Sequence, residues 1–157
     1  MLLSPVGTWE ERESRKFWPG AWIDVNPYGN KYTNPSTGRV SYHTGADLNL
    51  NAPHWDADRL APVYAICMGI ISFTGFLDVW GNVIVIRHVY GDAVFYARYA
   101  HVVMSKVARG QTVTPYSEIA KIGQDALKGP YHLHFDISLR MCWSRSQATG
   151  RGQIWPG

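Results

Sequence analysis

The chain has 157 residues, of which 46% are hydrophobic and 17% are charged. This composition is typical of a folded globular protein rather than a disordered one, and the length indicates one domain whose core needs no disulfide or metal to hold it. The net charge of +3 is too small to indicate a nucleic-acid partner.

The N-terminal part of the chain predicts little regular structure. Residues 1–19 are polar and mixed in charge, which indicates an arm or a short helix. Residues 20–40 are rich in Gly, Pro and Asn, which favour turns, and they predict a long loop of the kind that is often functional. The aromatic side chains in or beside this loop are expected to pack against the edge of the core rather than to form a substrate platform: Trp18, Trp22, Tyr28 and Tyr32.

Short strands are predicted in the rest of the chain, with no convincing amphipathic helix after residue 45. Residues 106–123 place Gly110 and Pro115 between short apolar pieces, as in tight hairpins. The other predicted strands are rich in β-branched and aromatic residues and lie at 62–76, 82–89, 92–101 and 131–139.

These patterns predict an all-β fold, a mainly antiparallel two-layer β-sandwich or barrel-like domain with long loops. We place this domain at residues 39–145. An N-terminal arm and loop region at 1–38 precedes it, and a C-terminal tail at 146–157 follows it.

No segment is expected to enter a membrane or to direct export. The most apolar stretch, residues 60–73, is short for a membrane span and is interrupted by Pro62 and Gly69. The start of the chain, "MLLSPVGTWEERESRK", lacks the apolar run of a secretory signal peptide. We therefore expect a soluble chain that leaves the cell by another route or is cut from something longer.

The last predicted strand carries two histidines in "HLHFDI". Alternate side chains of a strand share a face, so His132, His134 and Asp136 point one way and three apolar side chains point the other. Asp136 is expected either to support this histidine face from behind or to be solvated. An H-x-H pair alone is a hint, since a solvated polar face gives the same pattern.

Two other segments add candidate ligands. "YHTGADLNL" has His43 and Asp47 four residues apart, which places both side chains on one side of either a helix or a strand. Gly45 between them allows a close approach of the backbone. His101 stands at the end of a predicted strand in "RYAHVV".

Two imidazoles and one carboxylate are the ligand set of a catalytic zinc site, where the open fourth position activates a water molecule. A closed structural site would need cysteines, and Cys67 and Cys142 lie far from these motifs. We expect them to be two buried free thiols rather than a disulfide.

The polar residues also allow other interpretations. Two His and one carboxylate also describe a non-haem iron oxygenase, but its carboxylate usually follows the first His by two residues, and the H-L-H pair would have no role. His88 is expected to be a non-catalytic surface or half-buried residue. A second metal cluster is less expected than a solvated loop for three polar residues after Pro53: His54, Asp56 and Asp58.

Taken together, "HTGADLNL", "YAH" and "HLHF", with "APVYA", "GNVIVIRH" and "VARGQTV", resemble the lysostaphin and LytM type of zinc metallopeptidases over about residues 39–139. The resemblance implies a zinc cofactor, a metal groove between long loops, and cleavage of peptide bonds in the stem or cross-bridge of bacterial peptidoglycan. By position it implies that His43, Asp47 and His134 bind the metal. His101 and His132 would be metal-free catalytic residues, one the general base and the other the stabiliser of the oxyanion.

The sequence departs from that family pattern in three places. Residues 49–60 replace a short glycine-containing turn, and Trp55 in this insertion could line the substrate groove. Tyr116 stands where relatives favour glycine, and 124–131 replaces a small-residue segment and puts the bulky Tyr131 beside the site. We expect these departures to affect the choice of substrate more than zinc binding.

Two other functions fit the same resemblance. One is a catalytically silent member of the fold that binds the cell wall or activates a partner enzyme, although such modules usually lack some of the five residues that are intact here. The other is the same hydrolase as part of a phage tail or virion. In each case the expected partner is peptidoglycan at the bacterial cell wall, with no nucleic acid.

Overall fold

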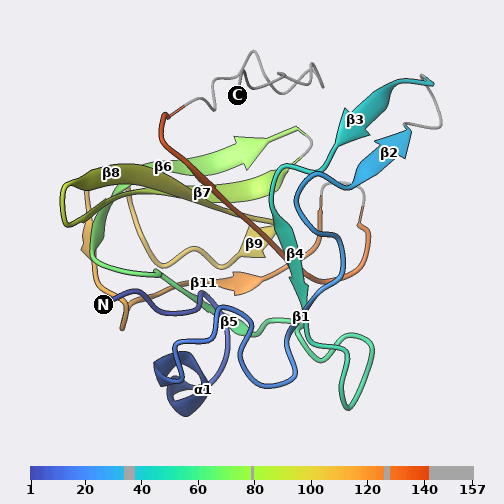
Figure 1. Cartoon of the computed structure of the whole chain (residues 1–157), viewed down its shortest axis with the longest axis horizontal. Helices are drawn as coiled ribbons and strands as arrows, with labels where there is room; N and C mark the ends of the chain where they lie inside the picture. Colours follow the sequence, from blue (N-terminus) through green and yellow to red (C-terminus); the bar gives the residue numbers. More distant parts are fainter. Residues whose placement is uncertain (34–37, 79, 126–127, 142–157) are drawn as a thin grey trace.

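The computed structural model describes residues 1–33, 38–78, 80–125 and 128–141. Within these ranges the chain forms one short helix and twelve strands in three antiparallel sheets, so the predicted all-β fold is confirmed (Figure 1). The elements are α1 (Trp9–Glu13), β1 (Ile23–Asp24), β2 (Lys31–Thr33), β3 (Val40–Tyr42), β4 (Ala46–Asn49), β5 (Pro62–Tyr64), β6 (Gly69–Leu77), β7 (Gly81–Tyr90), β8 (Ala93–Ala100), β9 (Val102–Val103), β10 (Thr112–Val113), β11 (Glu118–Ile122) and β12 (Leu133–Ser138).

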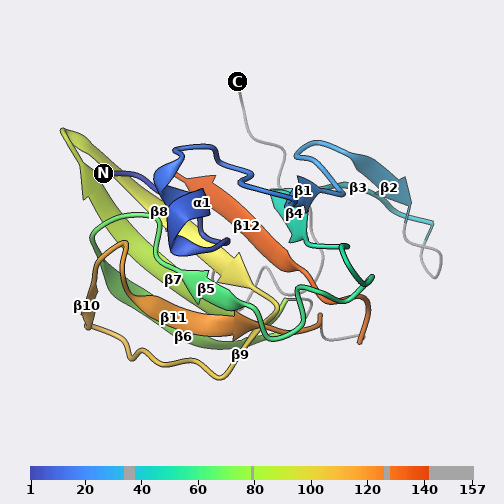
Figure 2. The same cartoon turned by 90° about the horizontal axis from the view of Figure 1, so that it is seen from below.

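The largest sheet has seven strands in the order β1-β4-β12-β8-β7-β6-β10. Its last strand in the chain, β12, lies between β4 and β8, as Figure 2 shows. In this register His134 stands opposite Asp47 of β4 on one side and Ala100 of β8 on the other. The insertion of β12 therefore brings together three segments that are far apart in the sequence.

The hydrophobic core lies between this sheet and a second sheet of three strands, β5-β11-β9. Because side chains alternate along a strand, Leu133 and Phe135 of β12 and Tyr99 of β8 point into the core. The residues between them, including His134, point to the other face of the seven-stranded sheet. The fold thus separates an apolar inner face from an outer face that can carry polar chemistry.

The N-terminal arm is packed onto this core. A capping box starts α1, in which the Thr8 hydroxyl accepts from the Glu11 amide and the Glu11 carboxylate accepts from the Thr8 amide. Val6 and Trp22 are members of the core cluster. Arg12 is only 1% exposed, because it reaches back under the arm to carbonyl groups. The short helix that the composition allowed is therefore present.

The segment predicted as a loop at 20–40 is more regular than expected. It contains β1, which pairs with β4, and β2, which pairs with β3 in a separate two-stranded sheet. The Gly, Pro and Asn residues lie between these short strands and do not prevent the strands from forming. The expected packing holds for Trp22 and Trp18, but it is wrong for Tyr28 and Tyr32, which are 71% and 51% exposed.

The hairpin expected within 106–123 is not formed. β10 pairs with β6, whereas β11 pairs with β5 and β9 in the other sheet. A turn closed by a hydrogen bond from the Ser117 amide to the Thr114 carbonyl carries the chain between the layers. Val113 and Ile119 consequently enter the same core from two different sheets.

Two further sequence expectations concern membranes and thiols. The helix of the described ranges has five residues, and nothing there offers the length of apolar helix that a bilayer crossing requires. Cys67 is a buried free thiol, as expected. Cys142 lies outside the described residues.

Candidate metal centre and catalytic site

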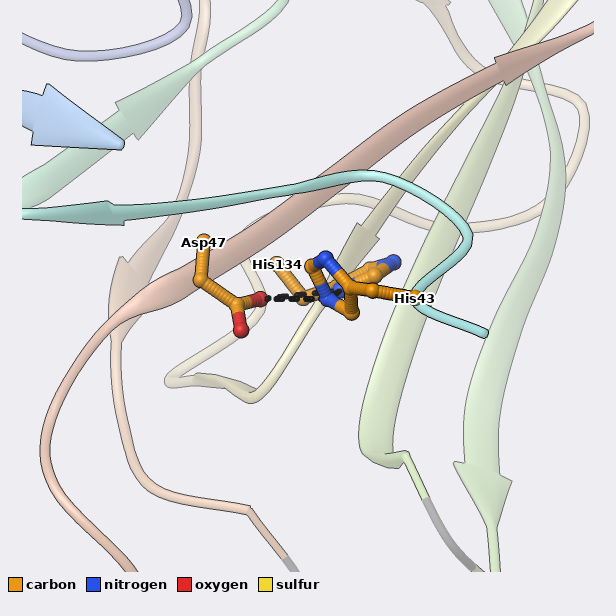
Figure 3. Close-up of side chains that lie close together, drawn as sticks. All are labelled: His43, Asp47 and His134. Atoms are coloured by element: carbon orange, nitrogen blue, oxygen red, sulfur yellow. Dashed lines mark hydrogen bonds and ion pairs between the residues drawn. The ribbon is translucent and has the colours of Figure 1, made fainter. Parts of the chain in front are cut away.

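His43, Asp47 and His134 converge on one point, as Figure 3 shows. His43 precedes β4, Asp47 lies on β4, and His134 faces Asp47 from β12. The Asp47 Oδ1 atom is 3.1 Å from His43 Nε2 and 3.0 Å from His134 Nδ1, and the two nitrogens are 3.0 Å apart. A tetrahedral zinc ion with bonds of about 2.0–2.1 Å would separate its ligands by roughly 3.3 Å, so the triangle is close to the required size.

The chemistry of this donor set also fits a divalent cation. His134 is 1% exposed and has a carboxylate oxygen at each ring nitrogen: Asp47 Oδ1 at Nδ1, and Asp136 Oδ2 at 3.2 Å from Nε2. A neutral imidazole has only one N–H, so one of its nitrogens presents a lone pair to a carboxylate. A cation held between Nδ1 and Asp47 would convert that repulsion into ligation. Zinc, which prefers His nitrogen and carboxylate oxygen, suits these atoms.

Asp47 is held as an ionised carboxylate. Burial acts to raise its pKa, but hydrogen bonds with His134, His43 and Asn26 lower the pKa well below its usual range. The Asn26 amide donates to Oδ2 at 3.0 Å, which leaves Oδ1 for the two histidines. The pKa of His43 is raised, because the hydrogen bond and charge of Asp47 outweigh the effect of burial.

The backbone around Asp47 is supported by the segment that contains β1. The Asp47 amide donates to Asp24 Oδ1 at 3.1 Å, and its carbonyl accepts from the Val25 amide at 2.9 Å. Neither Asp24 nor Asn26 could be singled out from the sequence, because turn-rich segments contain many such residues in solvent. Their contact with Asp47 depends on the pairing of β1 with β4.

The close approach expected at Gly45 is made to β12. A Cβ atom at this position would stand 2.4 Å from the Phe135 carbonyl oxygen and 2.9 Å from His134 Nε2. Any side chain would therefore push β12 away and move His134. Glycine is required here for the strand packing that brings the two metal-binding segments together.

His101 and His132 lie beside the proposed metal ligands. Their ring centroids are 4.6 Å apart, and His132 Nε2 is 3.7 Å from Asp47 Oδ1. His132 Nδ1 is 2.9 Å from the Pro130 carbonyl oxygen, an acceptor, so Nδ1 carries the proton and Nε2 presents its lone pair to the site. The structure thus brings together all five residues that the sequence analysis singled out.

His101 is held in an unusual conformation. Its φ of 61° lies in the left-handed region, which costs a non-glycine residue about 1 kcal/mol or more. The His101 amide donates to the Trp80 carbonyl at 3.2 Å, and its carbonyl accepts from the Gly123 amide at 2.7 Å. Burial, together with His132 and His134, lowers the pKa of His101 to about 3, so this ring is neutral at neutral pH.

Three further residues lie next to the histidines of the site: Asp136, Arg98 and Trp80. Asp136 is 7% exposed, so the alternative that it is solvated is wrong. Burial acts to raise its pKa, but the hydrogen bond with His134 and the charge of Arg98 lower it. Trp80 has its ring centroid 4.5 Å from that of His134. Arg98 and Trp80 were missed by sequence reasoning, and a lone arginine or tryptophan in a strand pattern carries no signal that could have found them.

The remaining polar candidates are not part of this centre. Among the described residues, the group that could hold a metal consists of His43, Asp47 and His134, so a second cluster at His54, Asp56 and Asp58 is not found there. The solvated-loop expectation is wrong for Asp58, which is fully buried. Burial raises its pKa to about 6.

His88 and the three aromatic residues at the departures from the family pattern differ in their exposure. His88 is fully buried rather than at the surface, with Nδ1 3.0 Å from the Met68 carbonyl and 3.2 Å from Cys67 Sγ. Trp55 and Tyr116 are largely exposed, at 68% and 61%. Tyr131 is partly buried and packs against the core.

Comparisons with known proteins identify one family and several similar structures. The family model described as Peptidase family M23 matches residues 41–146. No curated protein matches the chain.

Several solved structures are similar. A zinc containing peptidase from Vibrio cholerae shares 26% identity at a TM-score of 0.63, covering 87% of this chain and 36% of that one. The catalytic domain of the antimicrobial peptidase lysostaphin from Staphylococcus simulans shares 25% identity at a TM-score of 0.61, covering 80% and 85%. The SpoIIQ and SpoIIIAH complex, at 19% identity and a TM-score of 0.63, covers 88% and 92% and shares the fold. The chain thus spans only 36% of the length of the Vibrio cholerae protein.

Proposed function

The chain belongs to Peptidase family M23, and we propose that it is a zinc-dependent endopeptidase that cleaves peptide bonds in the stem or cross-bridge of bacterial peptidoglycan. The observation that carries this proposal is the convergence of His43 Nε2, Asp47 Oδ1 and His134 Nδ1 within 3.1 Å of one another. Two further histidines, neither of them in the triangle, stand next to it.

His43, Asp47 and His134 would hold the metal, and zinc, when bound, supplies a Lewis acid that activates water and polarises the peptide carbonyl. His132 is the general base in this proposal. Its Nδ1–H is held by the Pro130 carbonyl, which leaves the Nε2 lone pair free to accept a proton. The same Nε2–H can then pass the proton to the leaving amine.

His101 has a different part in the proposed reaction. Because burial keeps its ring neutral, it is a weak base near neutral pH, but its N–H can donate to the oxyanion that develops on the carbonyl oxygen. The hydrogen bonds of its backbone to Trp80 and Gly123 hold the main chain, and the rings of Trp80 and His132 pack against the imidazole before substrate arrives. A donor that is already oriented needs no rearrangement in the transition state.

The substrate and the site of action are inferred from the family. The lysostaphin structure is that of an antimicrobial peptidase, and a peptide of the bacterial wall is the substrate class that fits such an activity. The protein would then act at the cell wall. The intact set of five side chains also argues against a catalytically silent wall-binding module.

The test combines metal analysis with digestion. Purified protein should contain about one zinc per chain, and it should release peptide fragments from purified peptidoglycan of some species, identified by mass spectrometry and abolished by a chelator. Asp47→Ala should lose both the metal and the activity, because Asp47 supplies the only carboxylate of the triangle. Asp92→Asn, in an exposed turn, is the matched control and should keep both.

Two results would overturn the proposal. One is an Asp47→Ala variant that binds zinc as tightly as the parent. The other is iron at this site with oxygen-dependent turnover, which would indicate the non-haem oxygenase chemistry that also uses two His and one carboxylate.

A further inference from the structure

An ion pair lies directly behind His134, on the side away from the proposed metal. Asp136 and Arg98 face each other across β12 and β8, and a guanidinium nitrogen of Arg98 donates to Asp136 Oδ2. The two side chains are 7% and 4% exposed. Removing two charges from water costs several kcal/mol per ion, so this pair is not explained by stability alone.

The oxygen that Arg98 contacts is also the oxygen that faces the histidine. Asp136 Oδ2 is 3.2 Å from His134 Nε2, and it accepts a further hydrogen bond from the Thr44 hydroxyl at 3.4 Å. Arg98 also donates to the Thr44 hydroxyl, at 3.2 Å. Asp136 therefore cannot turn away from His134 without breaking contacts with two other side chains.

Arg98 also reaches the second half of the site through an aromatic ring. Its guanidinium carbon lies 3.7 Å from the ring centroid of Trp80, a cation–π contact. The Trp80 ring packs against His134 at 4.5 Å between centroids and stacks on His101 at 6.2 Å. One buried guanidinium thus contacts both the partner of a proposed ligand and the wall beside a proposed catalytic histidine.

We propose that Asp136 and Arg98 are positioning residues for the metal centre. Asp136 accepts the Nε2–H of His134, which fixes the tautomer with the Nδ1 lone pair facing His43 and Asp47, and Arg98 fixes Asp136. This inference rests on the proposed function in one respect: that the ion at the triangle is zinc. Carboxylates behind metal-binding histidines typically change metal affinity by 10- to 100-fold when removed.

The experiment measures the dissociation constant of Zn²⁺ by competition with a chromophoric chelator, using the full chain. Asp136→Ala should weaken zinc binding by about 10- to 100-fold, and Arg98→Met by about 10-fold, because Asp136 keeps its place less firmly. The double variant should be no weaker than Asp136→Ala alone, since both residues act through the same ring nitrogen. Activity is not needed for this readout.

A second readout separates positioning from a purely structural role. In the zinc-loaded parent, the ¹⁵N chemical shifts of the His134 ring should show a proton on Nε2 and none on Nδ1. In Asp136→Ala the Nε2–H should lose its hydrogen-bond signature and exchange faster with solvent. Glu118→Gln is the matched control: it removes a carboxylate from an ion pair on β11, in the other sheet, and should leave both readouts unchanged.

Folding is followed by circular dichroism, and Asp136→Asn keeps the shape of the side chain if the alanine variant does not fold. Asp136 variants that are folded and bind zinc as tightly as the parent would overturn the positioning role, and so would Asp136→Asn and Arg98→Met variants that both fail to fold. A parent protein that binds no zinc would instead refute the proposed function. The two failures are therefore distinguishable.

Discussion

Two buried arginines hold together two different parts of this molecule. Arg12 of α1 is 1% exposed and Arg98 of β8 is 3% exposed, and each guanidinium lies over an aromatic ring, Tyr64 at 4.1 Å and Trp80 at 3.7 Å. Arg98 pairs with the carboxylate of Asp136. Among the contacts described, Arg12 donates instead to backbone carbonyl groups of three segments, at Ser4, Ala65 and Pro115.

The difference shows what marks a functional site. The hydrogen-bond acceptors of Arg12 are main-chain atoms from the N-terminal arm, the residue after β5 and the turn before β11, so these bonds join segments of the fold. The partners of Arg98 are side chains that touch the histidines of the site. A buried charge alone therefore does not indicate function, whereas a buried charge whose partners face titratable side chains does.

The largest effect is expected on stability, when Arg12 is replaced. Arg12→Met should lower the free energy of unfolding by about 4 kcal/mol, because three buried carbonyl groups lose a charged donor, at roughly 1–3 kcal/mol each before the chain relaxes. Urea denaturation measures this change. In the folded protein, zinc affinity should stay within about twofold of the parent.

The control for Arg12 is Arg109→Met, at an exposed position in a turn. It should change the free energy of unfolding by less than about 0.5 kcal/mol. If Arg12→Met remained folded and yet lost zinc affinity as Arg98→Met is expected to, the distinction between the two arginines would fail.

The second largest effect is expected on the catalytic rate, at His101, which stacks on Trp80 beside Arg98. His101→Ala should lower kcat by about 100-fold or more, equivalent to about 3 kcal/mol in the barrier, because the proposed oxyanion donor is lost. Zinc affinity should change little, since His101 lies outside the metal triangle. Single-turnover digestion and chelator competition measure the two quantities.

His54→Ala, at an exposed position of the 49–60 insertion, is the matched histidine control and should change neither quantity. A His101→Ala variant with full activity would refute the role assigned to His101. A variant that lost zinc as well would show that the stacked wall of Trp80 and His101 supports the metal ligands directly.

The five histidine and aspartate residues of the site could be predicted from the sequence, whereas neither buried arginine could. His43 and Asp47 are four residues apart, and His132 and His134 are two apart, so local strand geometry alone places each pair on one face. The resemblance to a metallopeptidase family then supplied the expectation that they meet. The strand order that brings them together, with β12 between β4 and β8, was not visible in the residue pattern.

Arg12, Arg98 and Asp58 could not have been found in this way, because burial of a charged residue is decided by contacts between distant segments. Arg12 contacts Pro115, and Arg98 contacts Asp136, across 103 and 38 positions of the chain. The hairpin expected at 106–123 failed for a related reason. Short apolar pieces around Gly110 and Pro115 predict strands, but they do not specify which neighbours those strands choose.

Asp58 is another buried titratable residue, and its side chain has fewer hydrogen bonds than that of Arg12 or Arg98. Asp58 is fully buried, its Oδ2 accepts one long hydrogen bond from the Leu50 amide at 3.4 Å, and its Oδ1 has no hydrogen-bond partner among the described residues. Burial raises its pKa to about 6, above the value of about 4 in an unfolded chain. The stability contributed by the protonated form is complete below pH 4 and is lost as the pH rises through 6.

Asp58→Asn should therefore remove this pH dependence and raise the free energy of unfolding by about 2 kcal/mol at pH 8. Urea denaturation between pH 4 and pH 8 measures the difference between the variant and the parent. Asp92→Asn, which removes the same charge from an exposed turn, should follow the parent to within about 0.5 kcal/mol. Parallel profiles for Asp58→Asn and the parent would show that burial does not penalise this carboxylate.

The smallest effect is expected at an ion pair that is neither deeply buried nor near the site. Glu118 on β11 contacts Lys106 at 2.7 Å and Lys121 at 2.9 Å, distances as short as those of buried pairs, but its side chain is 25% exposed and that of Lys106 is 51% exposed. Exposed pairs contribute about 0–1 kcal/mol, because water and salt screen the attraction. Glu118→Gln should therefore lower the free energy of unfolding by less than about 1 kcal/mol, and by still less at high salt. Urea denaturation at low and high salt measures both values. A loss comparable to that of Arg12→Met would mean that contact distance, rather than burial and the identity of the partner, decides what a charged residue contributes in this fold.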